Sequence, residues 1–312
     1  MTDVAERCVD AINDLSGRHP GYRAAHARGT LCAGTFTASP GAAELTSAAH
    51  MSGDRVRVTV RFSNGSGDPS TPDGDRRDGR GMAVKFYLPG GGTTDIVALT
   101  LPCFFVRTPE DFIAFAVARK PDPDSGEPDM AKIGAFVQEH PETAVALQQI
   151  LPSLVPPRSY ATAAYNSIHS FRLVNGGAGR YARYRFVPEA GVEAMPDDQL
   201  DSASPEYLQE EIRARLERGP VRFTLLARLA ADGDAVDDPT VPWPDGEREE
   251  VELGTVELTG LDTERETGDD VLVFDPTRVT DGIELSDDQI LRVRGPAYSV
   301  SVERRSGAPR PA

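Results

Sequence analysis

The segment LRVRGPAYSVSVERR, residues 291–305, sets one tyrosine among four arginines in an acidic chain. In a helix, Arg294 and Tyr298 would lie on one face, four residues apart, so the guanidinium could approach the phenol oxygen. A fixed cation beside a phenol favours the phenolate, which is a ligand for ferric iron. The alternative is an amphipathic helix with Tyr298 in the core and the arginines in solvent. From the spacing alone we favour that alternative.

The start of this helix also has a local signal. Ser286 is followed three residues later by Gln289, which matches a capping box and predicts that the helix begins there. Gly295 and Pro296 then stand between Arg294 and Tyr298. A proline inside a helix removes one backbone hydrogen bond and usually kinks it. We therefore expect Pro296 to interrupt the helix, which leaves the Arg294–Tyr298 geometry open.

A second group of candidate residues lies in the first part of the chain. His26 has arginines on both sides in GYRAAHARG, and Arg61 stands close to Ser63 in VRFSNGSG. The arginines suggest an anion nearby, although a lone histidine with basic neighbours is usually a surface residue. These two signals alone do not define a site.

The composition limits the classes of protein. Of 312 residues, 39% are hydrophobic and 26% charged, which is typical of a globular protein, and no apolar run is long enough to span a membrane. A formal charge of −16 without a basic patch argues against nucleic acid or membrane partners. The acidic amino terminus does not resemble a signal peptide, so we expect a cytoplasmic protein. Three cysteines without CxxC spacing predict reduced thiols.

The elements that would position these residues are both strands and helices. Period-two alternation predicts strands at 56–63, 82–88, 170–175, 181–187 and 221–229. Helices are predicted at 108–119, at 130–151 with a break at Pro141, and at 204–219 between Ser204 as cap and Gly219 as stop. Residues 120–129 and 231–250 are predicted to be surface loops. The pattern favours an α+β fold with an antiparallel barrel or strongly bent sheet, and one domain over 1–312, with an amino-terminal segment at 1–19 and a tail at 306–312.

Five motifs occur in order along the chain: RAAHARGTLCAGTF, VRFSNGSGDPSTPDGDRRDGRGMAVKF, TDIVALTLPCFFVRTPEDF, YNSIHSFRLVN and DGIELSDDQILRVRGPAYSVSVERR. Together they resemble the haem core of the catalase family over roughly residues 20–306. Several such motifs in the correct order are more specific than any one alone. The resemblance implies a haem b held by an antiparallel β-barrel with added helices, and it reverses our preference for the amphipathic-helix interpretation.

The resemblance also implies a role for each candidate residue. Tyr298 would bind iron as phenolate, Arg294 would keep it deprotonated, and His169 with Asp288 would extend a hydrogen-bonded chain behind that arginine. The family pattern places the haem propionates against three arginines and the distal pocket near two aromatic residues. In this sequence these are Arg23, Arg61 and Arg305, and Phe104 and Phe105.

On the distal side, the family pattern assigns the catalytic histidine to His26. As a neutral imidazole it would take a proton from the peroxide and return it to the departing oxygen, so that the O–O bond breaks heterolytically. Ser63 would support His26 through a hydrogen bond. The distal asparagine of true catalases aligns with Thr100, two residues before Pro102. Loss of that amide should impair hydrogen peroxide disproportionation.

The chain is also short for a catalase, and we expect it to lack the amino-terminal arm, the wrapping segment and the carboxy-terminal helical domain. A shorter, more open channel would admit larger substrates, and bound NADPH is not expected. The chain is therefore most similar to the small bacterial catalase-related peroxidases. That similarity implies reduction of organic hydroperoxides or hydrogen peroxide with a small organic electron donor, and weak or no catalase activity. We also expect a homodimer.

Two other functions are compatible with the same scaffold. One is a hydroperoxide isomerase or a biosynthetic tailoring enzyme, which would consume hydroperoxide without an electron donor. The other is a haem carrier or sensor without catalysis. A carrier needs no distal acid or base, so the presence of His26 and Ser63 argues against it.

Overall fold

The computed structural model describes residues 2–122, 124–263 and 272–306. The expected tail at 306–312 therefore lies outside the described residues, except for Ser306. The amino-terminal segment contains a helix, α1 (Thr2–Ser16), that was not predicted from the sequence. None of the helices in these described ranges combines the length and apolar character that spanning a membrane requires.

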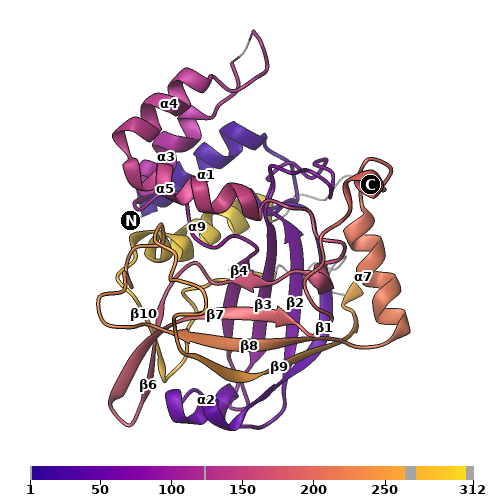
Figure 1. Cartoon of the computed structure of the whole chain (residues 1–312), viewed down its shortest axis with the longest axis vertical. Helices are drawn as coiled ribbons and strands as arrows, with labels where there is room; N and C mark the ends of the chain where they lie inside the picture. The colour runs from indigo at the N-terminus through magenta and orange to yellow at the C-terminus, as the bar shows by residue number, and fades with distance from the viewer. Residues whose placement is uncertain (1, 123, 264–271, 307–312) are drawn as a thin grey trace.

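Eight antiparallel strands close into a barrel in the described part of the chain (Figure 1). Their order is β7-β5-β4-β3-β2-β1-β9-β8, and pairing of β7 with β8 closes the ring. β6 and β10 extend the sheet beyond β7. The strands are β1 (Gly29–Ala38), β2 (Val56–Asn64), β3 (Arg80–Tyr87), β4 (Thr93–Leu99), β5 (Tyr165–Asn166), β6 (Phe171–Asn175), β7 (Ala178–Pro188), β8 (Val221–Leu229), β9 (Glu250–Leu261) and β10 (Ile283–Leu285). All five strands predicted from alternation are confirmed.

Alternation along the strands separates the barrel core from its outer face. On β3, Met82, Val84 and Phe86 belong to the apolar core, whose buried aromatic side chains include Phe62 and Phe223 on other strands. Two of the residues that alternate with them, Gly81 and Ala83, line the outer side, where their small size leaves room beside the wall. The outer face of β2, β3 and β4 is therefore available for a site.

A helical layer covers that side of the barrel (Figure 1). It consists of α1, α3 (Pro109–Ala118), α4 (Met130–Glu139), α5 (Pro141–Ile150) and α9 (Gln289–Arg305), and α1 packs against both α3 and α9. The predicted break at Pro141 is confirmed, because α4 ends at Glu139 and α5 starts at Pro141. Thr108 caps α3 by accepting a hydrogen bond from the Asp111 amide.

The remaining helices are short or lie beside the barrel. They are α2 (Pro40–Leu45), α6 (Asp197–Leu200), α7 (Tyr207–Arg218) and three single turns at Ala49–Met51, Leu151–Ser153 and Tyr160–Thr162. The prediction of Ser204 as helix cap is wrong, since α7 begins at Tyr207 after Glu206. Asp73 caps α7 from a distant loop by accepting a bond from the Leu208 amide at 2.8 Å, and no local pattern could have indicated this. Gly219 does end the helix.

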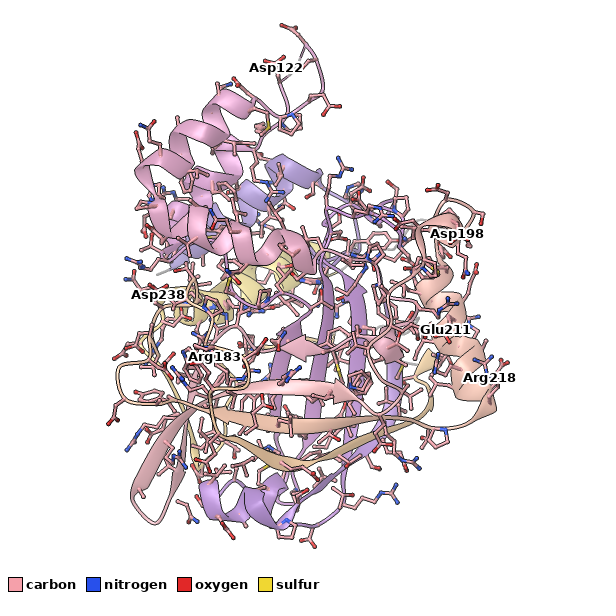
Figure 2. The ribbon with its side chains drawn as sticks, viewed as in Figure 1. Asp122, Arg183, Asp198, Glu211, Arg218 and Asp238 are labelled. Atoms are coloured by element: carbon pink, nitrogen blue, oxygen red, sulfur yellow. The ribbon has the colours of Figure 1, made fainter. Side chains whose placement is uncertain are left out.

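The two predicted loops differ in the contacts that hold them in place. Residues 231–249 contain no helix or strand, and β9 begins at Glu250. The buried Arg183 donates to the carbonyls of Val241 and Asp238 in this loop and lies over the ring of Trp243 at 4.5 Å. Figure 2 labels Arg183 and Asp238 beside this loop. The loop 120–129 is closed by a bridge between Pro121 and Pro128.

Helix α9 corrects two predictions. Its cap is Asp288 rather than Ser286, since the Asp288 carboxylate accepts from the amides of Ile290 and Leu291, whereas the Ser286 hydroxyl is buried without a partner among the described residues. The expected interruption at Pro296 is also wrong, because the helix is continuous from Gln289 to Arg305. Helix α9 packs against α1 and α3, and tertiary packing of this kind provides most of the stability of helices in proteins.

Candidate functional site

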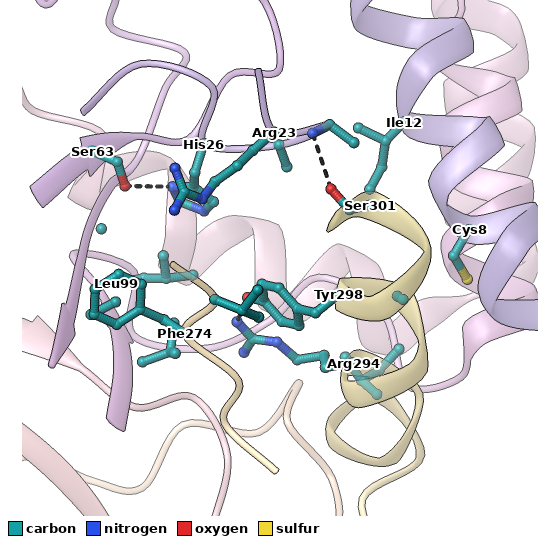
Figure 3. A pocket seen from close by; sticks show the side chains of 18 of the residues that line it. Cys8, Ile12, Arg23, His26, Ser63, Leu99, Phe274, Arg294, Tyr298 and Ser301 are labelled. Atoms are coloured by element: carbon teal, nitrogen blue, oxygen red, sulfur yellow. Dashed lines mark hydrogen bonds between the residues drawn. The ribbon is translucent and has the colours of Figure 1, made fainter. Parts of the chain in front are cut away.

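A large cavity lies between the outer face of the barrel and the helical layer (Figure 3). It contains about 1310 Å³ of space between atoms, counting its opening to solvent. Its walls include parts of α1, the loop before β1, the strands β2 to β4, α3, the segment 273–274 and helix α9. The residues that line it include Cys8, Val9, Ile12, Arg23, His26, Arg61, Ser63, Gly81, Ala83, Leu99, Phe104, Phe112, His169, Val273, Phe274, Arg294, Tyr298, Ser301 and Arg305.

His26 is held rigidly on one side of this cavity. Its backbone φ is 54°, in the left-handed region that residues other than glycine rarely adopt. The amide of His26 donates to the Gly65 carbonyl at 3.0 Å, and Arg61 donates to the carbonyl of His26 at 2.9 Å. The ring nitrogen Nδ1 lies 3.0 Å from the Ser63 hydroxyl. The loop geometry and Ser63 together direct the other ring nitrogen, Nε2, toward the cavity.

The surroundings of His26 keep its imidazole neutral. Burial is the largest effect and lowers the pKa of His26 to about 3, and the cations of Arg61, Arg294 and Arg23 contribute in the same direction. A neutral imidazole can accept a proton at one nitrogen while it donates from the other. This is the protonation state that the expected role of His26 requires.

Arg294 and Tyr298 face the cavity from helix α9. The Nη2 of Arg294 donates to the phenol oxygen of Tyr298 at 2.7 Å, in the register expected of residues four apart in a continuous helix. Figure 3 shows both side chains on the opposite side of the cavity from His26. The Tyr298 oxygen therefore accepts a charge-assisted hydrogen bond from Arg294, and a tyrosine oxygen is one of the protein ligands that hold haem iron.

Behind Arg294, part of the expected hydrogen-bonded chain is present. His169 Nδ1 lies 2.6 Å from a carboxylate oxygen of Asp288, and both side chains are buried. Burial lowers the pKa of His169, partly opposed by Asp288. The Nε2 of His169 has no hydrogen-bond partner among the described residues, so the link from His169 to Arg294 is not made.

The three arginines predicted for the propionates also border this cavity. The guanidinium groups of Arg23 and Arg305 converge on one acceptor, the Leu272 carbonyl, at 2.8 and 3.2 Å. Arg61 donates to the carbonyls of His26 and Ala27. Three cations thus border the cavity, two of them on one shared acceptor, and such groups suit an anionic ligand.

The remaining predicted site residues do not all line the cavity. Phe104 lines the cavity, whereas Phe105 does not and instead packs on Phe115 in the helical layer. Thr100 is also outside the lining, and its hydroxyl accepts a hydrogen bond from the Arg80 amide at 3.0 Å. The neighbouring Leu99 reaches the cavity instead. The wall near Thr100 thus presents an aliphatic side chain rather than a hydrogen-bonding group.

Several lining residues were missed by the sequence analysis. Helix α1 contributes Cys8, Val9 and Ile12, and with the buried Ala5 these follow the i, i+3, i+4, i+7 spacing of an amphipathic helix. That spacing was readable in the sequence. Phe274 could not have been found, because no local pattern marks it.

Gly81 is a further missed residue with a clear role. A Cβ at this position would lie 2.9 Å from the Ser63 hydroxyl and 3.1 Å from the His26 ring. Glycine therefore leaves the space that the His26–Ser63 pair occupies.

Comparison with known proteins agrees with this arrangement. The family model described as Catalase matches residues 8–309, so the chain belongs to the catalase family. Among its relatives are small peroxidases. The chain is 43% identical to the catalase-related peroxidase of Mycolicibacterium paratuberculosis, over 98% of this chain and 96% of that protein. It is 32% identical to the catalase-related peroxidase of Synechococcus elongatus, over 96% of this chain and 88% of that protein.

Solved catalase structures share the fold. A fungal catalase superimposes with a TM-score of 0.81 at 25% identity, covering 93% of this chain and 60% of that one. Catalase A of Saccharomyces cerevisiae superimposes with a TM-score of 0.82 at 24% identity, covering 93% and 62%. The chain thus spans about three fifths of these catalases. The predicted catalase-like antiparallel barrel with added helices is confirmed.

Membership of the catalase family implies haem binding, and the residues present fit a haem. The cavity joins a tyrosine held by a guanidinium, a cluster of arginines and broad apolar walls from Phe104, Phe112 and Phe274. These groups match an iron, two carboxylates and a planar apolar ring, respectively.

Proposed function

We propose that this protein is a haem-dependent peroxidase that reduces organic hydroperoxides or hydrogen peroxide with a small organic electron donor, and that its catalase activity is weak or absent. The observation that carries the proposal is the pairing of Arg294 with Tyr298 at 2.7 Å on one side of a cavity whose other side holds His26 on Ser63. Relatives that match nearly the whole chain are named catalase-related peroxidases, which supports it.

In this proposal the cavity would hold haem b, which would supply an iron centre that exchanges electrons with peroxide and donor. Tyr298 would ligate the iron as phenolate, and Arg294 would hold the ligating oxygen by donating from Nη2. Arg23, Arg61 and Arg305 would meet the propionates. The Asp288 carboxylate fixes the ring of His169 behind this side of the cavity.

His26 performs the proton transfers. The mechanism uses the tautomer with the proton on Nδ1, in which Nδ1–H would donate to the Ser63 hydroxyl 3.0 Å away and Nε2 would accept a proton from the inner oxygen of the peroxide. The same nitrogen then returns the proton to the outer oxygen as it departs as water or an alcohol. An imidazole with a pKa of about 3 is a weak base, but at neutral pH it is always in the uncharged form needed to begin.

The features around Thr100 support peroxidase rather than catalase activity. A catalase must orient a second hydrogen peroxide molecule for oxidation. Here the Thr100 hydroxyl is bonded to the Arg80 amide, and Leu99 lines the cavity at this point. The apolar surface favours a larger organic molecule over hydrogen peroxide.

The experiment that tests this function compares turnover on hydrogen peroxide and on cumene hydroperoxide, each with and without a phenolic donor. We expect donor-dependent reduction of both peroxides, an alcohol product from cumene hydroperoxide, and little oxygen release from hydrogen peroxide. Consumption of hydroperoxide at an undiminished rate without donor would instead indicate an isomerase or tailoring enzyme. Absence of reaction with any peroxide would indicate a haem carrier.

Two further expectations belong to this proposal. We propose a cytoplasmic location and a homodimeric assembly, with no nucleic acid, membrane or NADPH partner. The chain's acidity, a formal charge of −16, supports the absence of a polyanionic partner. Light scattering of the purified protein measures the assembly directly, and a monomeric mass would contradict the dimer.

A further inference from the structure

Residues 272–278 form a short segment, here called the strap, that lies between the barrel wall and helix α9. The strap lines the cavity with Val273 and Phe274. It also presents the Leu272 carbonyl on which Arg23 and Arg305 converge. One backbone carbonyl thus accepts hydrogen bonds from two of the cations that line the cavity.

The strap is fastened to strand β4 by one fully buried carboxylate. One oxygen of Asp95 accepts from the Lys85 ammonium at 2.6 Å. The other accepts from the Asp275 amide at 2.9 Å and from the Arg278 guanidinium at 2.6 Å. Asp95 therefore joins two cations and the strap backbone at a single point.

Neighbouring contacts extend this attachment along the strap. The Arg278 carbonyl accepts from the Asp95 amide at 3.1 Å and from the Thr94 hydroxyl at 2.9 Å. Arg278 Nη1, the nitrogen that meets Asp95, also donates to the Val273 carbonyl at 3.1 Å. The charged cluster thus reaches the residue next to Leu272.

Lys85 completes the cluster from strand β3. Its ammonium lies 5.3 Å from the centre of the Phe274 ring, within cation–π distance. Phe274 is itself part of the cavity wall. The same ion pair that binds the strap backbone therefore contacts the strap's cavity-facing side chain.

We propose that Asp95 is a positioning residue for binding of the cofactor's carboxylates. By fixing the strap, it sets the Leu272 carbonyl, which orients the guanidinium groups of Arg23 and Arg305 toward the cavity. Each guanidinium has several N–H donors, so the bond to the carbonyl orients the group while using only one of them. The inference rests on the proposed function, in which these arginines meet the haem propionates.

The test measures haem release from the full-length protein to an excess of a haem-scavenging globin. The protein is loaded either with hemin or with hemin dimethyl ester, whose propionates carry no charge. We expect Asp95→Asn to accelerate release of hemin by about tenfold, the equivalent of one or two lost hydrogen bonds. Release of the ester should change far less, since it makes no charged contact with Arg23 or Arg305.

Two further variants complete the test. Arg278→Gln removes the bond to Val273 from a side chain that is 36% exposed, and we expect the same selective effect. If Asp95→Asn does not fold, Arg278→Gln tests the proposal on its own. Glu257→Gln is the control, because Glu257 also bridges two arginines, Arg55 and Arg222, but on strand β9 at a distance from the strap. It should release both ligands at the wild-type rate.

The outcomes separate this inference from the proposed function. Equal acceleration for hemin and the ester would show that the strap is only a wall of the cavity, and unchanged release of both would show that it is irrelevant to binding. Either result overturns the inference. Failure of the unaltered protein to bind hemin at all would instead overturn the proposed haem site.

Discussion

The carboxylate of Asp288 connects His169 to the start of the helix that carries Tyr298. One oxygen lies 2.6 Å from Nδ1 of His169, and the other accepts from the amides of Ile290 and Leu291 at 2.8 and 3.1 Å. A single buried side chain thus caps α9 and orients the histidine behind the candidate ligand. The stability of this helix and the geometry of the site depend on the same residue.

Asp288→Ala is expected to lower the free energy of unfolding by about 2–4 kcal/mol, since it removes a helix cap and leaves His169 without its partner. Asp288→Asn retains an acceptor oxygen for the helix and should cost less than half as much. Urea denaturation of both variants measures the difference. Equal losses would show that capping contributes nothing.

Tyr298→Phe is expected to abolish the absorption bands of ferric iron bound by phenolate, or to abolish haem binding, because the phenol oxygen is the proposed ligand. Tyr87→Phe serves as control: its hydroxyl bonds to Thr59, and it does not line the cavity. Absorption spectra of the purified proteins provide the measurement. An unchanged spectrum in Tyr298→Phe would refute the ligand assignment.

His26→Ala is expected to retain haem and to slow peroxide cleavage by roughly a hundredfold or more, the typical contribution of a positioned acid and base. Ser63→Ala should have a smaller effect, because it removes only the hydrogen bond that orients Nδ1. Stopped-flow kinetics with cumene hydroperoxide measure the cleavage step. A His26→Ala variant that reacts at the normal rate would exclude His26 as the proton carrier.

Gly81→Ala is expected to slow the same step while haem remains bound, because the new methyl group would displace the Ser63 hydroxyl or the His26 ring. Gly260→Ala on strand β9 is the matched control, since no described atom outside its immediate chain neighbours lies within 4 Å of the place that its new methyl group would take. Stopped-flow rates of peroxide cleavage and the haem content of both variants provide the measurement. Normal peroxide cleavage in Gly81→Ala would mean that the His26–Ser63 pair can shift without loss of activity.

Acid is expected to destabilise the protein through His50. Its ring is buried against Phe36 and Phe86 with neither nitrogen hydrogen-bonded among the described residues, and burial lowers its pKa to about 4. Between pH 6.5 and 4 the unfolded chain binds a proton that the folded protein excludes. Stability is therefore complete above pH 6.5 and falls by roughly 3 kcal/mol as the pH approaches 4.

The variant His50→Leu isolates this effect from that of His26, whose lowered pKa acts in the same direction. Unfolding in urea at a series of pH values should show a shallower decline below pH 6.5 for His50→Leu than for the unaltered protein. Identical slopes would mean that His50 does not contribute.

Local patterns predicted much of the fold. The strands at 56–63 and 221–229 and the break at Pro141 follow from alternation and from proline chemistry, which act over a few residues. The caps of α7 and α9 were assigned wrongly, because Asp73 lies more than a hundred residues from the helix it caps and Asp288, rather than Ser286, accepts from the first amides of α9. Local sequence offers several capping candidates, and tertiary contacts select among them.

For the site, the sequence by itself determined which chemical groups are available. The order of the motifs around His26, Ser63, Arg294 and Tyr298 was sufficient to assign the family, because residue types and their spacing can be read directly from the sequence. Only the tertiary structure placed Leu99 rather than Thr100 at the cavity, added Phe274 and helix α1 to its wall, and connected Asp95 to the arginines through the strap. These relations join residues distant in the chain, and only three-dimensional packing and burial decide which of them meet.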